Sequence, residues 1–456
     1  MDGALTVPGG VSADDVVSGT VETDSRLVGA GSVFFALPGE TTDGHLFAEA
    51  AVRGGAAVLV VERFLPLDVP QILVPDGVAA LGRLAAEVVA RVRAGGSLRV
   101  VGITGSNGKT TTKNLLRAVL ETQGATVAPQ GSYNNQVGAP ISMLQITRDT
   151  RYLIVEMGAG GPGEVGRLAE MARPDIAIVL KVGLAHAGVF QTLEATQKAK
   201  AEIVTGLPDS AVAILNRDDG RVAAMADMTA ARPVWFGLDG DADPRAEDIQ
   251  ATADGTAFEL VCGPDRRSVK LQILGEHHVM NALAAIAAAR ELGVPLDAAV
   301  AAIEGVGRAE RWRMEILRPG GGVVVINDAY NASPDSMAAA LKTLAQVVGP
   351  GQRSVAVLGE MTELGDVADE SHDRIGRLVV RLNVQKLVVV GHGARHIHNA
   401  AGLEGSWDGE SVLVDSADEA YDLLRDELRE GDIVLVKSSK SAGLRFLGDR
   451  LGGVVS

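Results

Sequence analysis

Hydrophobic and polar positions divide the chain into two kinds of segment that follow one another. Short apolar runs rich in valine, isoleucine and leucine, such as residues 98–104 and 175–183, are typical of buried strands. Longer stretches carry apolar residues three or four positions apart, as in residues 109–124, and this spacing is typical of helices. Continuous apolar strands that alternate with helices indicate parallel sheets covered on both faces. The pattern therefore predicts an α/β fold.

The segments group into three predicted domains. Residues 1–97 form a small α/β domain, which ends in the glycine-containing linker "RAGGSL". Residues 98–314 begin with a strand that runs into a glycine-rich turn, and they continue as a parallel-sheet domain. Residues 315–456 alternate strand and helix again, which is typical of a doubly wound, Rossmann-like domain.

Composition narrows the class of protein. The 456 residues carry a net charge of −16 without a run of lysine and arginine, which argues against nucleic-acid or anionic-membrane binding. The single cysteine, Cys262, excludes an intramolecular disulfide and a cysteine zinc cluster, and it suits a reducing compartment. The N-terminus lacks signal-peptide features, and no apolar run reaches the roughly 18–20 residues that cross a bilayer. We expect a soluble cytoplasmic protein without membrane insertion.

The stretch "GITGSNGKTTT" (102–112) is the strongest local signal. A strand enters a glycine-rich turn, and a Lys-Thr pair opens a helix whose N–H groups can cradle phosphate oxygens. Lys109 can reach the β- and γ-phosphates, and the Thr110 hydroxyl suits Mg²⁺. Ile103 replaces the first glycine of the usual pattern, but its remainder is intact. An ordinary glycine-rich turn is the alternative; the context favours an ATP loop made of Thr104, Gly105, Ser106, Asn107, Gly108, Lys109, Thr110 and Thr111.

Further polar residues follow predicted strands. Glu156 ends one strand, at the sheet edge where ligands bind in open α/β sheets, and its carboxylate suits Mg²⁺; the alternative is an acid that faces solvent. His186 follows another strand, but imidazole is a less usual Mg²⁺ partner, so spacing alone indicates a structural residue. Asn134 and Asn135 can hydrogen-bond a carboxylate or a developing oxyanion, or they can simply form a turn.

Two lysines in "QKAKAEI" lie on different sides of a predicted helix. Lys198 stands four residues from Glu194 and from Glu202, as expected of an exposed side chain with surface ion pairs. Lys200 shares the apolar side of the helix, and burial there would favour its neutral amine. Spacing alone leaves open whether the Lys200 ammonium reaches water or stays buried and reactive.

Several of these motifs resemble those of the Mur ligases, the amide-forming enzymes that build the peptidoglycan stem peptide. The phosphate loop is similar to theirs and to that of folylpolyglutamate synthases. Residues 24–60 resemble the UDP-sugar-binding domain of the later-acting Mur ligases, and the C-terminal motifs resemble those of the members that add D-Ala-D-Ala. The resemblance covers nearly the whole chain, and its further motifs are "YNNQVGAP" (133–140), "EMGAG" (156–160), "ILNRDD" (214–219), "GEHHVMNALAA" (275–285), "INDAYNASPDSMAAAL" (326–341) and "VLGEMTELGDVADESH" (357–372).

The resemblance implies an ATP-dependent ligase of peptidoglycan precursor synthesis. ATP would phosphorylate the terminal carboxylate of a UDP-N-acetylmuramoyl tripeptide, and the amine of D-Ala-D-Ala would then attack the acyl phosphate. Two anions must be brought together, which calls for Mg²⁺ and lysines. The family also implies a carbamate, formed from CO₂ on Lys200. We expect a monomer; the sequence does not decide whether the third residue of the stem peptide is diaminopimelate or lysine.

The resemblance also assigns roles to single residues. The catalytic residues would be Lys109, Glu156, His186 and Lys200; the metal ligands Thr110, Glu156, His186 and carbamylated Lys200; the other nucleotide-binding residues Asn281, Arg313, Asp328 and Asn331; and the substrate-binding residues Ser25, Arg26, Asp43, His45, Asn134 and Asn135. Taken alone, many of these would be helix caps, turn formers or surface residues.

The sequence leaves two other functions open, and two of its residues differ from the family motifs. The chain could be a ligase that adds a single diamino acid, although the D-N-P-R motif of those enzymes is absent, or a non-catalytic relative. Folylpolyglutamate synthases lack a matching first domain. Lys181 stands where the family usually has asparagine, and Lys440 where it has arginine, which cannot be replaced by lysine in bidentate contacts. His372 matches a histidine of the family's C-terminal domain, and a simple surface histidine is the alternative. We interpret His392, His396 and His398 as part of a solvated loop.

Overall fold

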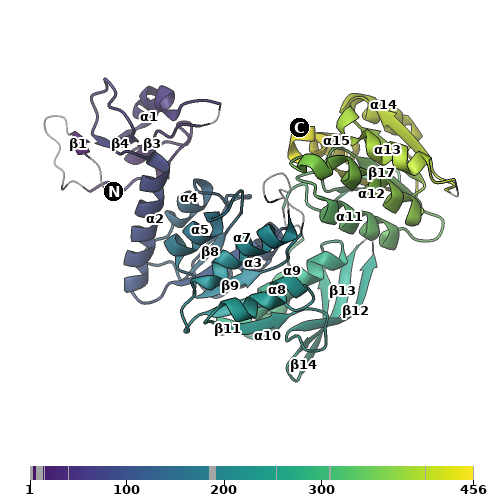
Figure 1. The fold of residues 1–456 in the computed structure, drawn as a ribbon, viewed down its shortest axis with the longest axis horizontal. Coiled ribbons are helices and arrows are strands. Elements are labelled where there is room, and N and C mark those ends of the chain that lie inside the picture. Colours follow the sequence, from purple (N-terminus) through teal and green to yellow (C-terminus); the bar gives the residue numbers. More distant parts are fainter. Residues whose placement is uncertain are drawn as a thin grey trace. The chain divides into compact units, whose positions relative to one another are not determined.

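The computed structural model describes most of the chain, and its helices and strands are drawn in Figure 1. Its contacts divide the chain into two compact units. The first unit comprises residues 1–102, 124–159 and 163–176, and the second comprises residues 103–123, 160–162 and 177–456. The described residues are 4–6, 14, 16–39, 41–183, 190, 192–252, 254–307, 310–405 and 407–454.

The N-terminal domain is a five-stranded sheet with the strand order β1-β5-β4-β3-β2. Four strands run parallel, and β1 pairs antiparallel with β5. Phe34, Leu59 and Val61 pack with helix α1 in a fully buried core. The 18-residue helix α2 leaves this domain, and Oδ1 of Asp76 caps it by accepting from the N–H of Ala79 at 2.8 Å. The elements are β1 (Ala4–Thr6), β2 (Val21–Glu22), β3 (Ser32–Phe35), α1 (Ala48–Gly54), β4 (Ala56–Val61), β5 (Gln71–Leu73) and α2 (Gly77–Ala94).

The middle of the chain forms a six-stranded sheet with the order β11-β10-β9-β6-β8-β7. The pairs β7–β8 and β10–β11 are parallel, and β8 is buried along its whole length. β6 lies inside the sheet, so the turn that follows it opens at an interior strand. The strands and helices are β6 (Arg99–Thr104), α3 (Lys109–Glu121), β7 (Thr126–Val127), α4 (Gly138–Met143), β8 (Tyr152–Glu156), α5 (Glu164–Ala172), β9 (Ile176–Val179), α7 (Leu193–Thr205), β10 (Val212–Asn216), α8 (Gly220–Ala223), β11 (Arg232–Phe236), α9 (Glu276–Glu291) and α10 (Leu296–Glu304).

An antiparallel sheet of three strands follows the six-stranded sheet. Its strands are β12 (Arg245–Thr252), β13 (Gly255–Cys262) and β14 (Asp265–Leu271), in that order. The hydrophobic pattern did not predict it, because β12 and β14 carry mostly polar residues and bury few of them. Helix α9 then returns through the core, and eleven of its sixteen residues are buried.

The C-terminal domain is the doubly wound domain that the sequence predicts. Its strands have the order β15-β16-β20-β17-β18-β19, parallel except for the edge strand β15. Side chains of β17 alternate between two buried clusters: Ala356 and Leu358 pack with α11, α12 and α13, whereas Val355 and Val357 pack with α14 and α15. The elements are β15 (Glu315–Gly320), β16 (Val323–Asn327), α11 (Pro334–Val347), β17 (Arg353–Leu358), α12 (Ala368–Arg381), β18 (Lys386–Val390), α13 (Arg395–Gly402), β19 (Glu410–Val414), α14 (Ala417–Glu427), β20 (Asp432–Lys437) and α15 (Leu444–Leu451).

Candidate active site

The predicted phosphate loop lies between a buried strand and a helix. β6 ends at Thr104, and α3 begins at Lys109 with Gly108 as its N-cap. Gly105 and Gly108 have φ angles of +151° and +89°, which residues with side chains rarely adopt, so this turn requires glycine at both positions. The hydroxyl of Ser106 accepts from the N–H of Gly183 at 2.8 Å and donates to its carbonyl at 3.0 Å. These contacts fix the loop against the segment that follows β9.

Lys109 folds over the loop that it belongs to. Its Nζ donates to the carbonyl of Gly105 at 2.7 Å, and Thr110 and Thr111 are buried in the first turn of α3. The first N–H groups of a helix have no acceptor within the helix and carry a partial positive charge. The loop therefore offers backbone donors, a positive helix end and a lysine to an anion.

His278 and Asn281 lie one turn apart on α9, and Asn281 adjoins the loop. A Cβ atom at Gly108 would lie 2.3 Å from Oδ1 of Asn281. Nδ2 of Asn281 lies 3.1 Å from Nδ1 of His278 and donates to it, so the proton of this histidine resides on Nε2. Burial holds the pKa of His278 well below its usual range, and Nε2 has no partner among the described residues. A buried, unsatisfied N–H donor is suited to an acceptor atom of a ligand.

Lys200 is buried on α7, with 4% of its surface exposed, whereas Lys198 is exposed. Burial, and secondarily the charge of Lys109, lowers the pKa of Lys200 to about 7. The prediction that the two lysines differ is confirmed, and the interpretation in which the ammonium of Lys200 reaches water is wrong. Glu194 pairs with Arg221 at 3.2 Å, so the expected ion pair between Glu194 and Lys198 does not form.

In the first unit, Glu156 ends β8 as a buried carboxylate. Nδ2 of Asn134 donates to its Oε1 at 2.7 Å, so the alternative of a solvent-facing acid is wrong. Oδ1 of Asn135 instead accepts from the N–H groups of Val137 and Gly138 at 3.2 and 2.8 Å. The structure therefore distinguishes the two asparagines: one orients a carboxylate, and the other supports the start of α4.

The predicted nucleotide-binding residues of the C-terminal part lie around Lys437, a buried lysine that the sequence motifs did not single out. Nζ of Lys437 donates to Oδ2 of Asp328 at 2.6 Å and to the carbonyl of Asn331 at 3.0 Å. The guanidinium carbon of Arg313 lies 4.2 Å from the ring centre of Tyr330, and Nζ of Lys440 lies 5.8 Å from it. Lys440, where the resemblance leads us to expect arginine, thus lies over an aromatic ring.

The predicted UDP-side residues form two local networks in the N-terminal domain. Exposed Arg26 pairs with Asp24, its Nε donating to Oδ1 at 2.9 Å, and Ser25 lies in the turn between them. Nε2 of His45 accepts from the N–H of Glu62 at 2.9 Å, so its Nδ1 carries the proton and donates to Asp43 at 2.6 Å.

These contacts give the UDP-side residues different local roles. The N–H of His45 and the guanidinium of Arg63 hold the pKa of Asp43 below its usual range. His45 is buried and has a clear structural role, whereas Arg26 is open to a ligand.

The remaining predicted histidines have varied outcomes. His186 lies outside the described residues. His372 is buried, accepts from the N–H of Met361 at 2.9 Å and lies 2.7 Å from the carbonyl of Ala368, so its interpretation as a surface residue is wrong. His392, His396 and His398 lie in a short 3-10 turn and in helix α13, not in a loop.

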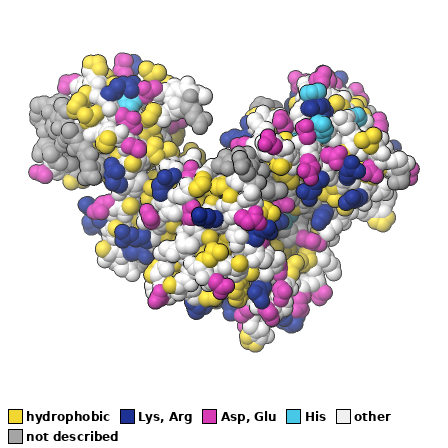
Figure 2. All heavy atoms as spheres, in the orientation of Figure 1, with side chains coloured by type: hydrophobic (Ala, Val, Ile, Leu, Met, Phe, Trp, Pro, Cys, Tyr) yellow, Lys and Arg dark blue, Asp and Glu magenta, His cyan; other side chains and the backbone are white. Residues whose placement is uncertain are grey.

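Figure 2 shows histidines together on the surface of the C-terminal domain. Within the described ranges, no group of three or more His, Cys, Asp or Glu side chains could hold a metal ion.

In the same ranges, no helix combines the length and apolar character that a membrane span requires.

The sequence did contain signals for the residues that were missed. His278 precedes Asn281 by three residues in "GEHHVMN", and residues at this spacing are neighbours on one face of a helix. The predicted nucleotide-binding role of Asn281 therefore also pointed to His278. Lys437 ends the apolar strand "DIVLVK", where a charge is unusual. Tyr330 had no such signal, because its role depends on Arg313 and Lys440, which are distant in sequence.

Comparison with known proteins identifies the family. The sequence model of the Mur ligase family catalytic domain matches residues 19–88. The Mur ligase middle domain matches residues 103–289, and the Mur ligase glutamate ligase domain matches residues 312–440. Together these matches cover most of the chain in the order that the resemblance implies.

Relatives and solved structures agree with this match. The UDP-N-acetylmuramoyl-tripeptide--D-alanyl-D-alanine ligase of Mycobacterium tuberculosis is 45% identical over 95% of this chain and 92% of its own. A crystal structure of MurF from Acinetobacter baumannii has a TM-score of 0.86 at 30% identity, over 95% of this chain and 93% of that chain. MurF from Thermotoga maritima in complex with ADP has a TM-score of 0.83 at 28% identity, over 95% and 97%. The chain belongs to the Mur ligase family, among the UDP-N-acetylmuramoyl-tripeptide--D-alanyl-D-alanine ligases.

Proposed function

We propose that this chain uses ATP to join D-Ala-D-Ala to UDP-N-acetylmuramoyl tripeptide. The observation that carries the proposal is an intact phosphate loop together with a buried Lys200, whose pKa of about 7 reflects its burial and the charge of Lys109. An ordinary nucleotide-binding turn does not need a second lysine that is neutral near physiological pH. Relatives that align with nearly the whole chain are named as UDP-N-acetylmuramoyl-tripeptide--D-alanyl-D-alanine ligases.

The reaction solves a chemical problem of the carboxylate, which is a poor acyl electrophile. Transfer of the γ-phosphoryl group of ATP to the tripeptide carboxylate gives an acyl phosphate. The amine of D-Ala-D-Ala attacks its carbonyl carbon, and the tetrahedral intermediate collapses to an amide and phosphate, with ADP left in the site. In this proposal Lys109 exchanges the Gly105 carbonyl for phosphate oxygens and neutralises their charge. The loop from Thr104 to Thr111 supplies N–H donors to the same oxygens.

We assign the remaining nucleotide contacts to α9 and to the C-terminal domain. Asn281 and His278 suit the base or ribose, because both are buried and Nε2 of His278 is an unsatisfied donor. Arg313, Asp328 and Asn331 are assigned to the phosphate and ribose side, where Lys437 holds Asp328 and Asn331. Ser25, Arg26 and Asp43 are assigned to the UDP end of the substrate, with His45 holding Asp43 in place. Asn134 is assigned to the peptide end, together with the Nδ2 group of Asn135, whose Oδ1 supports α4.

Magnesium fits the donors in this chain. Mg²⁺ typically takes one or two carboxylates together with substrate phosphates, and Glu156 is a buried carboxylate held in place by Asn134. We assign Thr110, Glu156, His186 and a carbamate on Lys200 as its ligands. The bound ion would neutralise phosphate charge. The neutral amine of Lys200 is the form that reacts with CO₂, and its burial protects the product from water.

Two measurements test these assignments. Phosphate release should require both UDP-N-acetylmuramoyl tripeptide and D-Ala-D-Ala; release with a free diamino acid in place of the dipeptide would show the other ligase type. Lys200→Ala should lose activity and regain part of it with added short-chain carboxylic acids. Retained activity without rescue would contradict the carbamate. We place the reaction in the cytoplasm, where ATP and UDP-linked precursors are available, and propose that a monomer performs it.

A further inference from the structure

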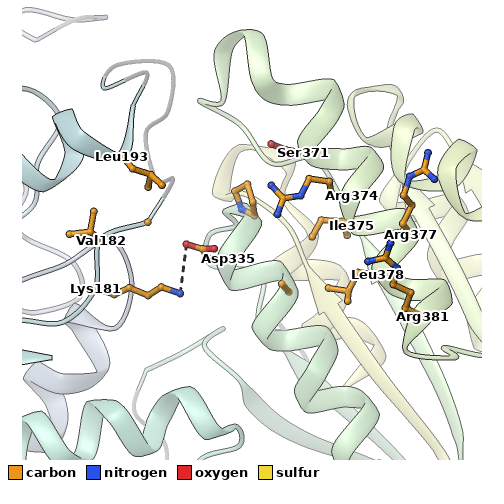
Figure 3. A pocket seen from close by; sticks show the side chains of 13 residues that line it. Lys181, Val182, Leu193, Asp335, Ser371, Arg374, Ile375, Arg377, Leu378 and Arg381 are labelled. Carbon is orange, nitrogen blue, oxygen red and sulfur yellow. Dashed lines mark ion pairs between the residues drawn. The ribbon is translucent and has the colours of Figure 1, made fainter. Parts of the chain in front are cut away.

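A cleft of about 590 Å³ lies beside the phosphate loop, within the second compact unit (Figure 3). One wall consists of Lys181, Val182 and Gly183, which follow β9, with Leu193 at the start of α7. Helices α11 and α12 of the C-terminal domain form the other wall. Gly183 exchanges two hydrogen bonds with Ser106, and the carbonyl of Lys181 accepts from the N–H of Ser106 at 2.8 Å. The cleft therefore shares a wall with the loop to which we assign ATP.

Helix α12 contributes three arginines to this cleft. Arg377 is already neutralised, because its Nε donates to Asp373 at 2.7 Å and its Nη1 to Glu404 at 3.2 Å. Arg374 and Arg381 are exposed and form no hydrogen bond or ion pair with another described residue. In Figure 3 the guanidinium of Arg374 extends from α12 toward the side of the cleft where Asp335 lies. Two cationic groups are therefore available to a ligand.

The rest of the lining has a different character. Asp335 lies on the first turn of α11, in the same wall as the arginines, and its carboxylate reaches toward Lys181, whose Nζ lies 3.9 Å from it. Val182, Leu193, Ile375 and Leu378 supply apolar surface. A carboxylate that reaches across to Lys181, two guanidinium groups from the neighbouring helix and apolar side chains in the lining match a small zwitterion with short apolar side chains.

We propose that this cleft binds the incoming D-Ala-D-Ala. Arg374 and Arg381 bind its terminal carboxylate, Asp335 attracts its amino end toward the wall that the cleft shares with the phosphate loop, and the apolar residues contact its two methyl groups. This assignment rests on the proposed function and adds to it the residues that select the second substrate. It gives α12 a role in binding the dipeptide, which neither the net charge of the chain nor its sequence motifs indicated.

Kinetics of the full-length protein test the assignment. The variants are Arg374→Gln, Arg381→Gln and both together, and phosphate release is measured while ATP, tripeptide and dipeptide are varied one at a time. Loss of a charge-assisted hydrogen bond should raise the KM for D-Ala-D-Ala roughly ten- to a hundredfold. The KM values for ATP and tripeptide should stay within about twofold, which also shows that the variants fold. Arg377→Gln is the matched control, because it removes the same charge from the same helix at a residue that is already paired.

A second comparison identifies the group that the arginines bind. Wild-type protein should use the dipeptide with an amidated C-terminus poorly, whereas the double variant should lose little further activity when the carboxylate is replaced by the amide. An unchanged dipeptide KM in the double variant would overturn the assignment. So would a rise in the tripeptide KM instead, or an equal effect in Arg377→Gln. If wild-type protein shows no phosphate release that depends on the dipeptide, the proposed function itself fails.

Discussion

Nζ of Lys181 lies 3.9 Å from Oδ2 of Asp335, which connects the segment after β9 to the first turn of α11. Both side chains are partly exposed, at 50% and 38%, so an ion pair of this kind contributes no more than about 1 kcal/mol. The pair shows where the Lys181 side chain points: at a position where the resemblance leads us to expect asparagine, it extends toward an acidic residue of the C-terminal domain. The carbonyl of Lys181 meanwhile holds the phosphate loop through Ser106.

Lys181→Asn should lower the Mg²⁺ concentration that half-saturates activity. A cation near a divalent ion opposes its binding, and removal of a partly exposed charge should change the requirement roughly two- to fivefold. Activity is measured against Mg²⁺ at fixed ATP. Lys198→Asn removes the same charge from an exposed position on α7 and should leave the curve in place. An identical curve for Lys181→Asn and wild type would contradict the expectation.

Asn134→Ala should impair catalysis through Glu156. The substitution removes the amide that donates to the buried carboxylate at 2.7 Å, and a lost bond to a buried charged group costs about 1–3 kcal/mol. We expect kcat to fall at least about tenfold, with a higher Mg²⁺ requirement. Gln136→Ala is the control, because it removes a neighbouring amide whose partner is Glu164. Equal kcat values for both variants would show that Asn134 does not orient Glu156.

Most of the fold could be predicted from the hydrophobic pattern, because buried strands and amphipathic helices each leave a periodic signal. The pattern located β6 and α3 within a few residues, and it predicted the alternating strands and helices of the C-terminal domain. It failed for β12 and β14, whose exposed polar residues resemble a loop when burial is unknown. It also failed for α13 and the 3-10 turn before it, where three histidines in a polar context suggested a loop although Ile397 and Ala401 pack into the core.

The candidate site could be predicted only where its chemistry is local in sequence. The glycines and the Lys-Thr pair of the turn from Gly105 to Thr110 lie within one short stretch of sequence, so the turn could be recognised there. Helical spacing placed Lys200 on the apolar side of α7, but only the structure shows that it is buried. The hydrogen bond between Lys437 and Asp328 could not be predicted in this way. The strands β20 and β16, at whose ends these residues lie, are far apart in sequence and meet only in the folded sheet. The same holds for Arg374 and Asp335, whose positions in one cleft depend on the packing of α11 and α12.

Gly108→Ala should abolish nucleotide binding and destabilise the protein more than its backbone conformation alone requires. The new Cβ would lie 2.3 Å from Oδ1 of Asn281 in a close-packed region, in addition to the cost of a φ of +89°. Gly96→Ala separates the two effects, because Gly96 has a similar φ of +96° with no atom within 4 Å. Calorimetric titration with an ATP analogue and thermal unfolding measure both consequences. Equal losses of stability in the two variants would exclude a steric role for Asn281.

Lys200 should make stability depend on pH. In the unfolded chain its amine binds a proton below about pH 10.5, whereas the folded protein holds its pKa at about 7. Between these values only the unfolded chain is protonated, so the stability cost of Lys200 grows as the pH falls from about 10.5 to 7 and is fully present below 7. Lys200→Met should therefore raise the melting temperature by more at pH 7 than at pH 10. At pH 7 the free energy of unfolding should rise by an amount on the order of a few kcal/mol.

The measurement on Lys200 needs buffer free of CO₂, because a carbamate would replace the amine. Thermal unfolding at the two pH values is compared with that of Lys198→Met, whose exposed amine should give no such difference. The outcome also bears on catalysis, since only the neutral amine reacts with CO₂. A gain in melting temperature that is the same at both pH values would mean that Lys200 keeps an ordinary pKa in the folded protein, and the carbamate would then lose its physical basis.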